Sequence, residues 1–366
     1  MSTDSYDVIV LGGGPVGENV ADRAVQGGLS AVIVESELVG GECSYWACMP
    51  SKALLRPAQA LRAAQHVAGA AEAVTGSLDV PAVLARRDSF ASNWSDEGQV
   101  DWLGSAGIGL VRGHGRLTGP REVTVETDDG GTRLLEARHA VVISTGSDAS
   151  IPPIDGLAEV SPWTSREATS AQEVPASLAI IGGGVVAVEM ATAYAAFGTD
   201  VTLVARHGLL GSMEPFAGER VEAGLRAAGV DVRTHTGTTR VRREANGVVI
   251  SLSDDTEVVA EQVLVATGRS PRSSDIGVET VGLTPGETIS TDDTLQVPGF
   301  DWLYAVGDVN GRVLLTHQGK YQARAAGDVI VARATGGGVD DADWGRHVAT
   351  ADAAAVPQVV FGEPEV

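Results

Sequence analysis

The chain contains the same local pattern twice: a short aliphatic run, a glycine-rich turn, and a stretch with helical character. The first copy joins the run Tyr6–Leu11 to the turn Gly12–Gly17 and the segment Glu18–Gly27. The second joins Leu178–Ile181 to the turn and helix start Gly182–Glu189. A strand that enters a helix through glycines exposes backbone amides at the helix N-terminus, and such amides bind phosphate groups. The pattern therefore predicts an α/β fold with two nucleotide-binding units.

The residues that follow each second strand indicate which nucleotides bind. The strand Ala31–Glu35 ends in an acid, at the spacing expected for a carboxylate that accepts a hydrogen bond from a ribose hydroxyl. The strand Asp200–Val204 is followed by Ala205, Arg206 and His207, so a cation stands where an NAD site would carry an acid. A cation suits the 2′-phosphate of NADPH, which is favoured over NADH; an ordinary surface arginine is the alternative. Two dinucleotides in one chain imply a flavin that receives hydride from a nicotinamide.

The only two cysteines of the sequence, Cys43 and Cys48, lie in the stretch Gly40–Leu55. They stand about one helical turn apart if the segment is helical, which suits a disulfide that opens and closes in place. A purely structural disulfide would gain little from so short a loop. Two unrelated free thiols are a second alternative, and a zinc site would need two further ligands at zinc spacing. The spacing favours a redox-active pair and no metal.

Composition limits the partners. With 366 residues, of which 43% are hydrophobic, the chain is long enough for two or three domains with cores of their own. A formal net charge of −22 disfavours nucleic acid and anionic membranes. The N-terminal residues lack the basic flank of a signal peptide, and the run Val8–Leu11 is too short to span a membrane. We expect a cytoplasmic protein, where a lone cysteine pair is more often catalytic or metal-binding than structural.

The rest of the chain predicts supporting elements. Alanine-rich helices are expected over Arg56–Val74 and Val80–Asn93, antiparallel meanders over Val100–Arg138 and Val230–Glu257, and a helix from Thr316 to about Ala334. Further buried strands that end in glycine are expected at 141–146, 262–268 and 302–307.

Taken together, these motifs resemble the pyridine nucleotide-disulfide oxidoreductases, the flavoprotein family of glutathione reductase, dihydrolipoamide dehydrogenase and mercuric reductase. The motifs that carry the resemblance are Gly12–Gly17, Gly40–Lys52, Gly182–Glu189, Ala266–Gly268 and Tyr304–Val309. They occur in the family's order and spacing across nearly the whole chain. The resemblance implies two Rossmann-like domains, for FAD and NAD(P), with three-layer ββα architecture and small antiparallel β-meanders.

The resemblance also implies the reaction. Hydride from NADPH would pass through FAD to a Cys43–Cys48 disulfide and on to a small-molecule or protein disulfide. Cys43 resembles the interchange thiol that attacks the substrate, and Cys48 the charge-transfer thiol that lies against the flavin. Lys52 resembles the lysine that pairs with Glu189 beside the flavin; a purely structural ion pair is the alternative there. The residues Pro50 and Ser51 suggest a helix N-terminus that would stabilise a Cys48 thiolate.

Other positions match residues that hold the cofactors in the family. Glu35 resembles the ligand of the adenosine ribose, and Asp308 the ligand of the flavin ribityl chain. The pair Arg206 and His207 is more similar to glutathione reductase than to dihydrolipoamide dehydrogenase. The expected cofactor-binding residues are Gly12, Gly14, Pro15, Val16, Gly17, Glu35, Gly41, Glu42, Lys52, Thr145, Gly146, Gly182, Gly184, Ala187, Arg206, His207, Gly268, Arg269, Gly307, Asp308, Thr316 and His317.

The chain also divides into consecutive parts, with the first boundary at the break Ile151–Pro153. The expected boundaries are 1–150 for the first part of the FAD-binding domain, 151–280 for the NAD(P)-binding domain, 281–335 for the return to the FAD-binding domain, 336–355 for a linker and 356–366 for the start of a truncated interface domain. In the family this last domain forms the dimer and supplies a His–Glu acid/base pair. We expect a homodimer for the full-length form and a monomer for this shortened chain.

Two further departures from the family pattern define the alternatives. The aromatic residues Tyr45 and Trp46 stand between the cysteines, where the family has smaller residues, and Ser212 stands at the place of a second 2′-phosphate arginine. If the aromatic residues block Cys43, the chain is a diaphorase, an electron-transfer flavoprotein or a redox-sensing module without a disulfide substrate. A second alternative is an enzyme similar to dihydrolipoamide dehydrogenase or mercuric reductase, although the additional C-terminal cysteine pair of mercuric reductase has no counterpart in this sequence.

Overall fold

The computed structural model describes residues 3–366, and the chain forms two compact units, each assembled from three separate segments. Unit 1 contains the residues up to Cys43, Trp94–Asp148 and Ser270–Pro357. Unit 2 contains Ser44–Asn93, Ala149–Arg269 and Gln358–Val366. The two glycine turns therefore belong to different units, and each unit has its own parallel sheet.

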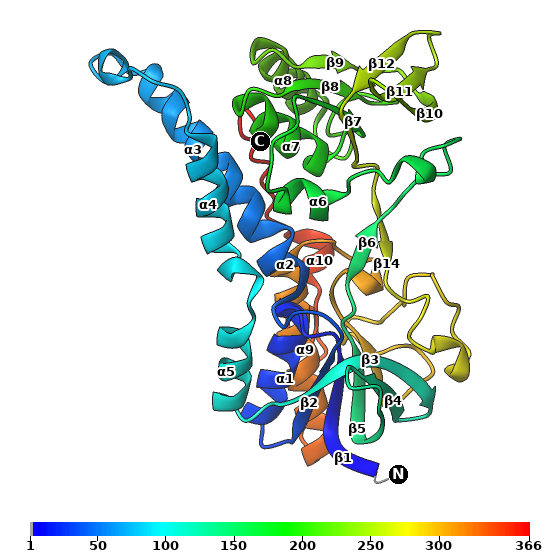
Figure 1. The fold of residues 1–366 in the computed structure, drawn as a ribbon. Coiled ribbons are helices and arrows are strands. Elements are labelled where there is room, and N and C mark those ends of the chain that lie inside the picture. The colour runs from blue at the N-terminus through cyan, green and yellow to red at the C-terminus, as the bar shows by residue number, and fades with distance from the viewer. Residues whose placement is uncertain (1–2) are drawn as a thin grey trace. The chain divides into compact units, whose positions relative to one another are not determined.

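The core of unit 1 is a six-stranded sheet (Figure 1). Its strands are β1 (Thr3–Leu11), β2 (Ala31–Glu35), β3 (Gly109–Gly119), β4 (Glu122–Thr127), β5 (Thr132–Ile143) and β15 (Leu303–Ala305). Strand β1 pairs in parallel with both β2 and β5, and β5 pairs in parallel with β15, whereas β4 is antiparallel to both of its neighbours. The long strands β3 and β5 thus take part in the parallel sheet and in a β-meander.

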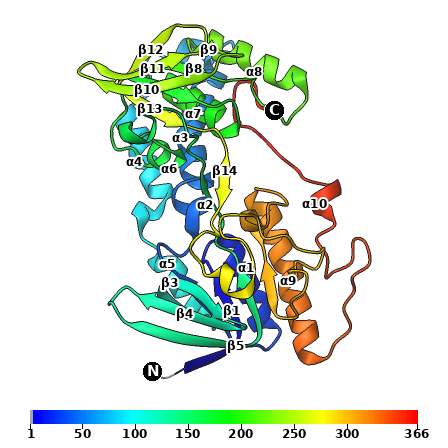
Figure 2. The same ribbon diagram turned by 90° about the vertical axis from the view of Figure 1, so that its right-hand side faces the viewer.

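The two faces of this sheet have different coverings, which makes three layers. Val8, Val10 and Ile33 face a cluster with α1 (Pro15–Gln26) and α9 (Thr316–Thr335), which lie side by side in both views (Figures 1 and 2). On the other face, Ile9 and Val32 pack with residues of the meander. Because side chains alternate along a strand, a run that is apolar at every position fits a sheet that is covered on both faces.

One part of the expected first meander is helical instead. Residues Glu97–Ser105 form α5, and the strands begin only at Gly109. Val100 and Leu103 are spaced for one face of a helix, and Leu103 is buried in the unit 1 core. The alternation that predicted strands from Val100 was therefore wrong for this segment.

Unit 2 contains a four-stranded parallel sheet and a separate antiparallel meander. The parallel sheet has the order β13 (Gln262–Val265), β7 (Ser177–Ile181), β8 (Asp200–Val204) and β9 (Asp231–Arg233). The meander consists of β10 (Thr238–Glu244), β11 (Gly247–Leu252) and β12 (Glu257–Ala260). The sequence pattern placed the residues from Val230 onward in the meander, but β9 joins the parallel sheet, because its buried Val232 packs in the core beneath α7 and α8.

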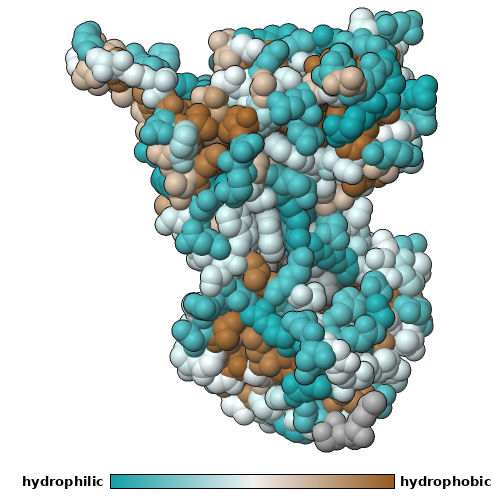
Figure 3. Space-filling model, viewed as in Figure 1, coloured by the Kyte–Doolittle hydropathy of each residue, from teal (hydrophilic) through white to brown (hydrophobic). Residues whose placement is uncertain are grey.

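The helices of unit 2 pack on this sheet and on one another. They are α3 (Cys48–Gln65), α4 (Val80–Phe90), α6 (Ser165–Ser170), α7 (Val185–Ala196) and α8 (Pro215–Ala227). A buried cluster of Leu54, Leu55, Val83 and Ala193 joins α3 to α4 and α7. The first alanine-rich helix was expected at Arg56–Val74; it begins and ends earlier, at Cys48 and Gln65. In Figure 3 hydrophobic residues are exposed along α3 and α4.

Short elements complete the chain. They are α2 (Gly41–Tyr45), η1 (Ala71–Ala73), η2 (Ser92–Trp94), β6 (Ser147–Ala149), η3 (Ala158–Val160), β14 (Arg269–Pro271), η4 (Val278–Val281), η5 (Gly307–Asn310) and α10 (Ala351–Ala354). Strands β6 and β14 form a two-stranded sheet. Across residues 3–366, no helix combines the length and the apolar composition needed to cross a membrane.

Residues 356–366, which the sequence suggested as a strand, form a tight turn instead. The backbone groups of Val360 and Val366 exchange hydrogen bonds of 2.7 and 3.2 Å. Val360 is fully buried in the core of unit 2, and Val366 packs against the same cluster. The segment folds back because its apolar residues find a partner surface on α7 and α8 rather than on a further strand.

Candidate active site

The first glycine turn has a backbone that only glycine can adopt. Gly12 has φ of +102°, and a Cβ atom there would lie 2.5 Å from the carbonyl oxygen of Ser144. A Cβ atom on Gly17 would lie 2.0 Å from the carbonyl oxygen of Gly12. Helix α1 therefore starts close to the end of β1, with Gly14 as its N-cap and Pro15 as its first residue. Its first amides are left available for an anion.

A cavity of about 230 Å³ opens beside this turn, within unit 1. Glu35 and Gly12 line it, and Leu11, Val34 and Ile276 form an apolar wall. The Glu35 carboxylate accepts the Gly13 N–H at 2.6 Å, and burial raises the pKa of Glu35. A carboxylate next to an apolar wall and a helix N-terminus suits a nucleoside linked to phosphates. The residues present therefore fit the adenosine diphosphate part of FAD.

The segment before the cysteines is held against the same turn. The Gly40 N–H donates to the carbonyl of Gly13 at 2.8 Å, and a Cβ atom on Gly41 would lie 2.8 Å from Gly14 Cα. Glu42 forms an ion pair of 3.2 Å with Arg272. Arg272 was not predicted from the sequence, because no motif marks it and it acts from a distant segment of the chain.

Asp308 lies in η5, at the end of β15. Its carboxylate accepts the Ser147 hydroxyl at 2.5 Å. Ser147 follows the expected pair Thr145 and Gly146, and the Thr145 hydroxyl donates to the Arg272 carbonyl at 2.6 Å. Ser147 was also missed by the sequence analysis, although its position directly after a predicted glycine turn is a signal that could have found it.

Glu18, one turn into α1, is buried, and its Oε1 atom has no hydrogen-bond partner among the described residues. Burial raises the pKa of Glu18 to about 7, while the charge of Lys320 opposes this shift and that of Glu35 adds to it. The side chain is therefore partly protonated near neutral pH. An orphaned oxygen beside the glycine turn fits a place where a polar ligand supplies the partner.

Replacing Glu18 with glutamine is expected to stabilise the chain at high pH. The pKa of this carboxyl is higher in the folded state, at about 7, than the ordinary value of 4.5, so the folded state binds more protons between these values. Stability conferred by Glu18 is therefore lost as the pH rises from 4.5 through about 7. We expect the variant to gain up to about 3 kcal/mol relative to the wild type between pH 4.5 and 8.

Urea denaturation of both proteins at pH 5 and pH 8 measures this gain. A difference between variant and wild type that does not change with pH would contradict the assignment. Glu72 is the control position, because it is exposed in η1, and Glu72→Gln should show no such pH dependence.

The two cysteines lie on two consecutive helices, a short one followed by a long one. Cys43 is in α2, and Cys48 is the first residue of the 18-residue α3; both are partly buried. The partial positive charge at the N-terminus of α3 would stabilise a thiolate at Cys48, whose catalytic role stays a prediction. The sequence suggested a helix start near Pro50, and the structure places it two residues earlier, at Cys48 itself.

The loop between the cysteines is fixed from α6. Trp46 precedes Ala47, the N-cap of α3, so its carbonyl lies outside the helix, and the Thr169 hydroxyl donates to it at 2.8 Å. The Arg166 guanidinium lies 4.2 Å from the centre of the Trp46 ring. Tyr45 is almost fully buried. These contacts lie within unit 2, and they hold the carbonyl and the ring of Trp46 against α6.

Lys52 and Glu189 form the expected ion pair. The Lys52 Nζ atom lies 3.1 and 2.8 Å from the two carboxylate oxygens, and the Glu189 side chain is only 5% exposed. Phe361 completes the group: its N–H donates to Glu189 Oε1 at 3.3 Å, and its ring centre lies 5.1 Å from Lys52 Nζ. Phe361 was not predicted, because no local sequence pattern connects residue 361 to residue 52. The catalytic role of the pair stays a prediction.

The second glycine turn repeats the geometry of the first in unit 2. Gly182 has φ of +139°, and Gly184 is the N-cap of α7, which contains the buried Ala187. The side chains of Arg206 and His207, just after β8, are exposed and form no hydrogen bond or ion pair with another residue in the described range 3–366. His235, after β9, joins them, because its N–H donates to the His207 carbonyl at 3.4 Å.

The expected cofactor residues thus fall into two groups. In unit 1 the turn Gly12–Gly17 lies close to Glu35 and Gly41, and Gly307 and Asp308 lie at the end of β15. In unit 2 the turn at Gly182 lies against Ala266, close to the expected Gly268. Thr316 opens α9, and His317 Nε2 is 2.8 Å from the carbonyl oxygen of Pro357. The binding roles of all these residues stay predictions.

The family model and the similar curated proteins point to the same family. A family described as "Pyridine nucleotide-disulphide oxidoreductase" matches residues 6–327. The chain is similar to the mercuric reductases of Shigella flexneri (32% identity, 100% of this chain and 63% of the relative) and Streptomyces lividans (33%, 99% and 74%). It is also similar to the dihydrolipoyl dehydrogenase of Pseudomonas aeruginosa (29%, 98% and 75%).

The fold has a close counterpart among solved structures. The Cu(II) complex of the HOCl-induced flavoprotein disulfide reductase RclA from Escherichia coli matches with a TM-score of 0.82 at 22% identity, over 99% of this chain and 76% of that chain. This likeness confirms the expected α/β fold class. The chain spans 63% of the length of the Shigella mercuric reductase that it matches.

Proposed function

Because this chain belongs to the pyridine nucleotide-disulphide oxidoreductase family, whose members use FAD and NAD(P)H, we propose that it is an FAD-dependent disulfide reductase. In this proposal two electrons from NADPH reach a Cys43–Cys48 disulfide, and the resulting dithiol reduces a disulfide substrate. The observation that carries the proposal is Cys48 at the N-terminus of α3, in the same unit as the ion pair of Lys52 and Glu189. When bound, FAD relays the electrons between the nicotinamide and the cysteines.

The residues of the chain define the thiol chemistry. The Cys43 thiolate attacks one sulfur of the substrate disulfide, the substrate S–S bond breaks, and one substrate thiol leaves with a proton. Cys48 then attacks Cys43 in the mixed disulfide and releases the second thiol. The cysteine pair is oxidised by two electrons, which NADPH replaces, so each cycle consumes one NADPH, one proton and one disulfide.

The first test is an anaerobic titration of the FAD-loaded chain with NADPH and, separately, with NADH. If FAD and the cysteine pair are coupled, uptake of about four electrons is expected, with a long-wavelength charge-transfer band at the two-electron stage. Uptake of only about two electrons, without that band, would refute the reductase and favour the diaphorase alternative. A panel of disulfides, together with Hg(II) and lipoamide, would then separate the substrate classes named in the relatives.

We also propose NADPH as the preferred reductant, supported by the exposed cluster Arg206, His207 and His235. If Arg206 binds the 2′-phosphate, replacing it with alanine removes a charge-assisted hydrogen bond. We expect kcat/KM for NADPH to fall by about tenfold to a hundredfold, with kcat/KM for NADH unchanged. Stopped-flow reduction of the FAD-loaded protein measures both constants.

The control for this prediction is Arg220→Ala, since Arg220 is an exposed arginine on α8 of the same unit. It should leave both constants unchanged. Equal losses with NADPH and NADH in the Arg206 variant would mean that Arg206 does not distinguish the two nucleotides.

The proposal also covers the cellular location and the oligomeric state of the protein. A redox-active cysteine pair suits a reducing compartment, so we place the protein in the cytoplasm, with a role in redox homeostasis. By analogy with the family, a longer form would be a homodimer. Sedimentation of the 366-residue chain would show whether it associates by itself.

A further inference from the structure

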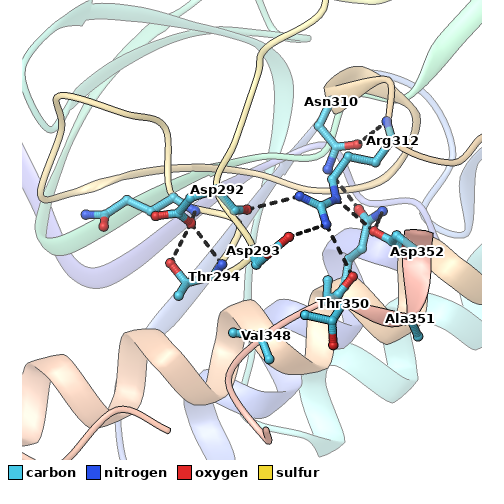
Figure 4. Close-up of polar contacts among 12 residues, drawn as sticks. Asp292, Asp293, Thr294, Asn310, Arg312, Val348, Thr350, Ala351 and Asp352 are labelled. Carbon is cyan, nitrogen blue, oxygen red and sulfur yellow. Dashed lines mark hydrogen bonds and ion pairs between the residues drawn. The ribbon is translucent and has the colours of Figure 1, made fainter. Parts of the chain in front are cut away.

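Asp352, in α10, is a buried carboxylate that receives three hydrogen bonds. Its side chain is 3% exposed. The Arg312 Nε–H donates to Oδ2 at 2.9 Å, Gln318 Nε2 donates to Oδ1 at 3.0 Å, and Gln322 Nε2 donates to Oδ2 at 2.8 Å. Figure 4 shows Asp352 on one side of the Arg312 guanidinium, with Asp293 on another. Nothing in the family motifs or in the proposed function uses this group.

Gln322 transmits this contact to the neighbouring turn. Its side chain is fully buried, and its Oε1 atom accepts both the Gly307 N–H at 2.8 Å and Asn310 Nδ2 at 2.9 Å. A backbone N–H can only donate, so the amide oxygen must face Gly307. The amide nitrogen therefore faces Asp352, which in its ionised form can only accept. Asp352 and Gly307 together determine which way the Gln322 amide points.

The turn that Gln322 supports carries Asp308. Residues Gly307–Asn310 form η5, in which Gly307 has φ of +76°. Asn310 is almost fully buried, and its Oδ1 atom accepts the Arg312 N–H at 3.0 Å. The chain of contacts therefore runs from Asp352 through Gln322 to both ends of the turn, and every donor along it has an acceptor.

We propose that Asp352 is a positioning residue for the cofactor: through Gln322 it holds the Gly307–Asn310 turn in the conformation that presents Asp308 to FAD. The inference rests on the proposed binding of FAD by Asp308. It assigns a role to residues 348–352, which the sequence pattern marked only as part of a linker. Asp352 acts through another residue and is not itself a catalytic residue.

The Arg312 ion pairs alone do not explain this arrangement. Arg312 also binds Asp293 at 2.7 Å and the carbonyl oxygens of Ala349 and Asp292 at 3.2 and 3.3 Å. It would hold residues 348–352 to the unit even without the Asp352 carboxylate. Asp293 is half exposed and forms no hydrogen bond with Gln322, whereas Asp352 accepts one from Gln322 Nε2. The two acids therefore differ in their contact with Gln322.

The test compares Asp352→Asn with Asp293→Asn in the full chain. The first substitution keeps the shape of the side chain but removes its charge, and it turns a donor either toward Gln318 or toward Arg312 and Gln322, which share Oδ2. The buried link is therefore weakened. We expect hydrogen exchange in peptides covering residues 303–311 of the FAD-free chain to accelerate by about tenfold, with β4 unchanged. We expect FAD to bind about tenfold more weakly. The Asp293 variant should leave both quantities at the wild-type value.

Asp352→Ala tests the link directly, because it removes both acceptor oxygens and leaves Gln322 Nε2 without its acceptor at position 352. Exchange should accelerate, and FAD affinity fall, at least as much as in Asp352→Asn. Asp352→Asn with unchanged exchange would overturn the proposal, as would faster exchange with wild-type FAD affinity.

Should Asp352→Asn fold poorly, Gln318→Leu removes one bond to Asp352 and should accelerate exchange in residues 303–311 by a smaller factor. No acceleration in that variant would also count against the proposal. A wild-type chain that takes up no FAD would refute the proposed function, and the exchange measurement on the FAD-free chain would still decide whether Asp352 holds the turn.

Discussion

Replacing Cys43 with serine is expected to lower the rate of disulfide reduction by at least about 10³-fold, the order expected when a covalent nucleophile is removed. A serine hydroxyl does not ionise near neutral pH, so it cannot attack the substrate disulfide. Reduction of the bound FAD by NADPH should be retained, because that step needs neither cysteine. The two rates are measured separately, by steady-state NADPH consumption with a disulfide and by anaerobic stopped flow without one.

The matched control is Ser44→Ala, which removes a hydroxyl from the adjacent residue of α2 and should change neither rate. If the Cys43 variant also lost its reduction by NADPH, the assignment of Cys43 as the substrate-attacking thiol would be wrong. If it kept full disulfide reduction, the cysteine pair would not be the route of the electrons.

The largest expected loss of stability follows from Arg87→Met. Arg87 lies in α4 and is fully buried, although it carries a charge. Its Nη1 and Nη2 atoms donate to the carbonyl oxygens of Thr169 and Ala171 at 2.5 and 2.8 Å, and its Nε atom donates to Asp88 at 2.6 Å. Methionine fills much of the space but removes the donor from the buried Thr169 carbonyl and from the partly buried Ala171 carbonyl. We expect the free energy of unfolding to fall by about 3 to 5 kcal/mol.

Arg86→Met is the control, because Arg86 is the neighbour on α4 and is only partly buried. Its Nη1 atom donates to the Ala53 carbonyl, which Pro57 leaves without a helical partner, and its guanidinium lies over the Phe90 ring. We expect a loss of only about 1 kcal/mol there. Urea denaturation of both variants measures the two free energies of unfolding. Equal losses would mean that the burial of Arg87 does not add to the cost of replacing it.

Arg87 also supports the loop between the cysteines indirectly, through α6. It anchors the end of α6, and α6 carries Thr169 to the Trp46 carbonyl and Arg166 to the Trp46 ring. A variant of Arg87 that folds is therefore expected to reduce disulfides more slowly, with NADPH reduction of FAD less affected.

The sequence was most informative where a short stretch determines its own structure. The glycine turns at Gly12 and Gly182 were predictable because their φ values exclude other residues and because an apolar run precedes each one. The pairing of Lys52 with Glu189 followed from the family resemblance and is present in the structure. These features depend on local spacing or on a motif that can be compared position by position.

The features that sequence reasoning missed depend on contacts between distant segments. Phe361 reaches Glu189, and Gln322 joins Asp352 to Gly307, through packing that no local pattern encodes. The helix α5 was taken for the start of a meander because Val100 and Trp102 have the spacing of a strand, whereas Val100 and Leu103 have that of a helix. His235 was missed because β9 was not expected to pair with β8.

The division of the chain has a consequence for synthesis and for engineering. The chain passes from one unit to the other after residues 43, 93, 148, 269 and 357, so neither unit corresponds to a continuous stretch that could be expressed alone. On the ribosome, unit 2 cannot bury Val360 until residues 358–366 emerge, long after its sheet has been made. Until then a nascent chain exposes part of the hydrophobic surface of unit 2, to which a chaperone could bind.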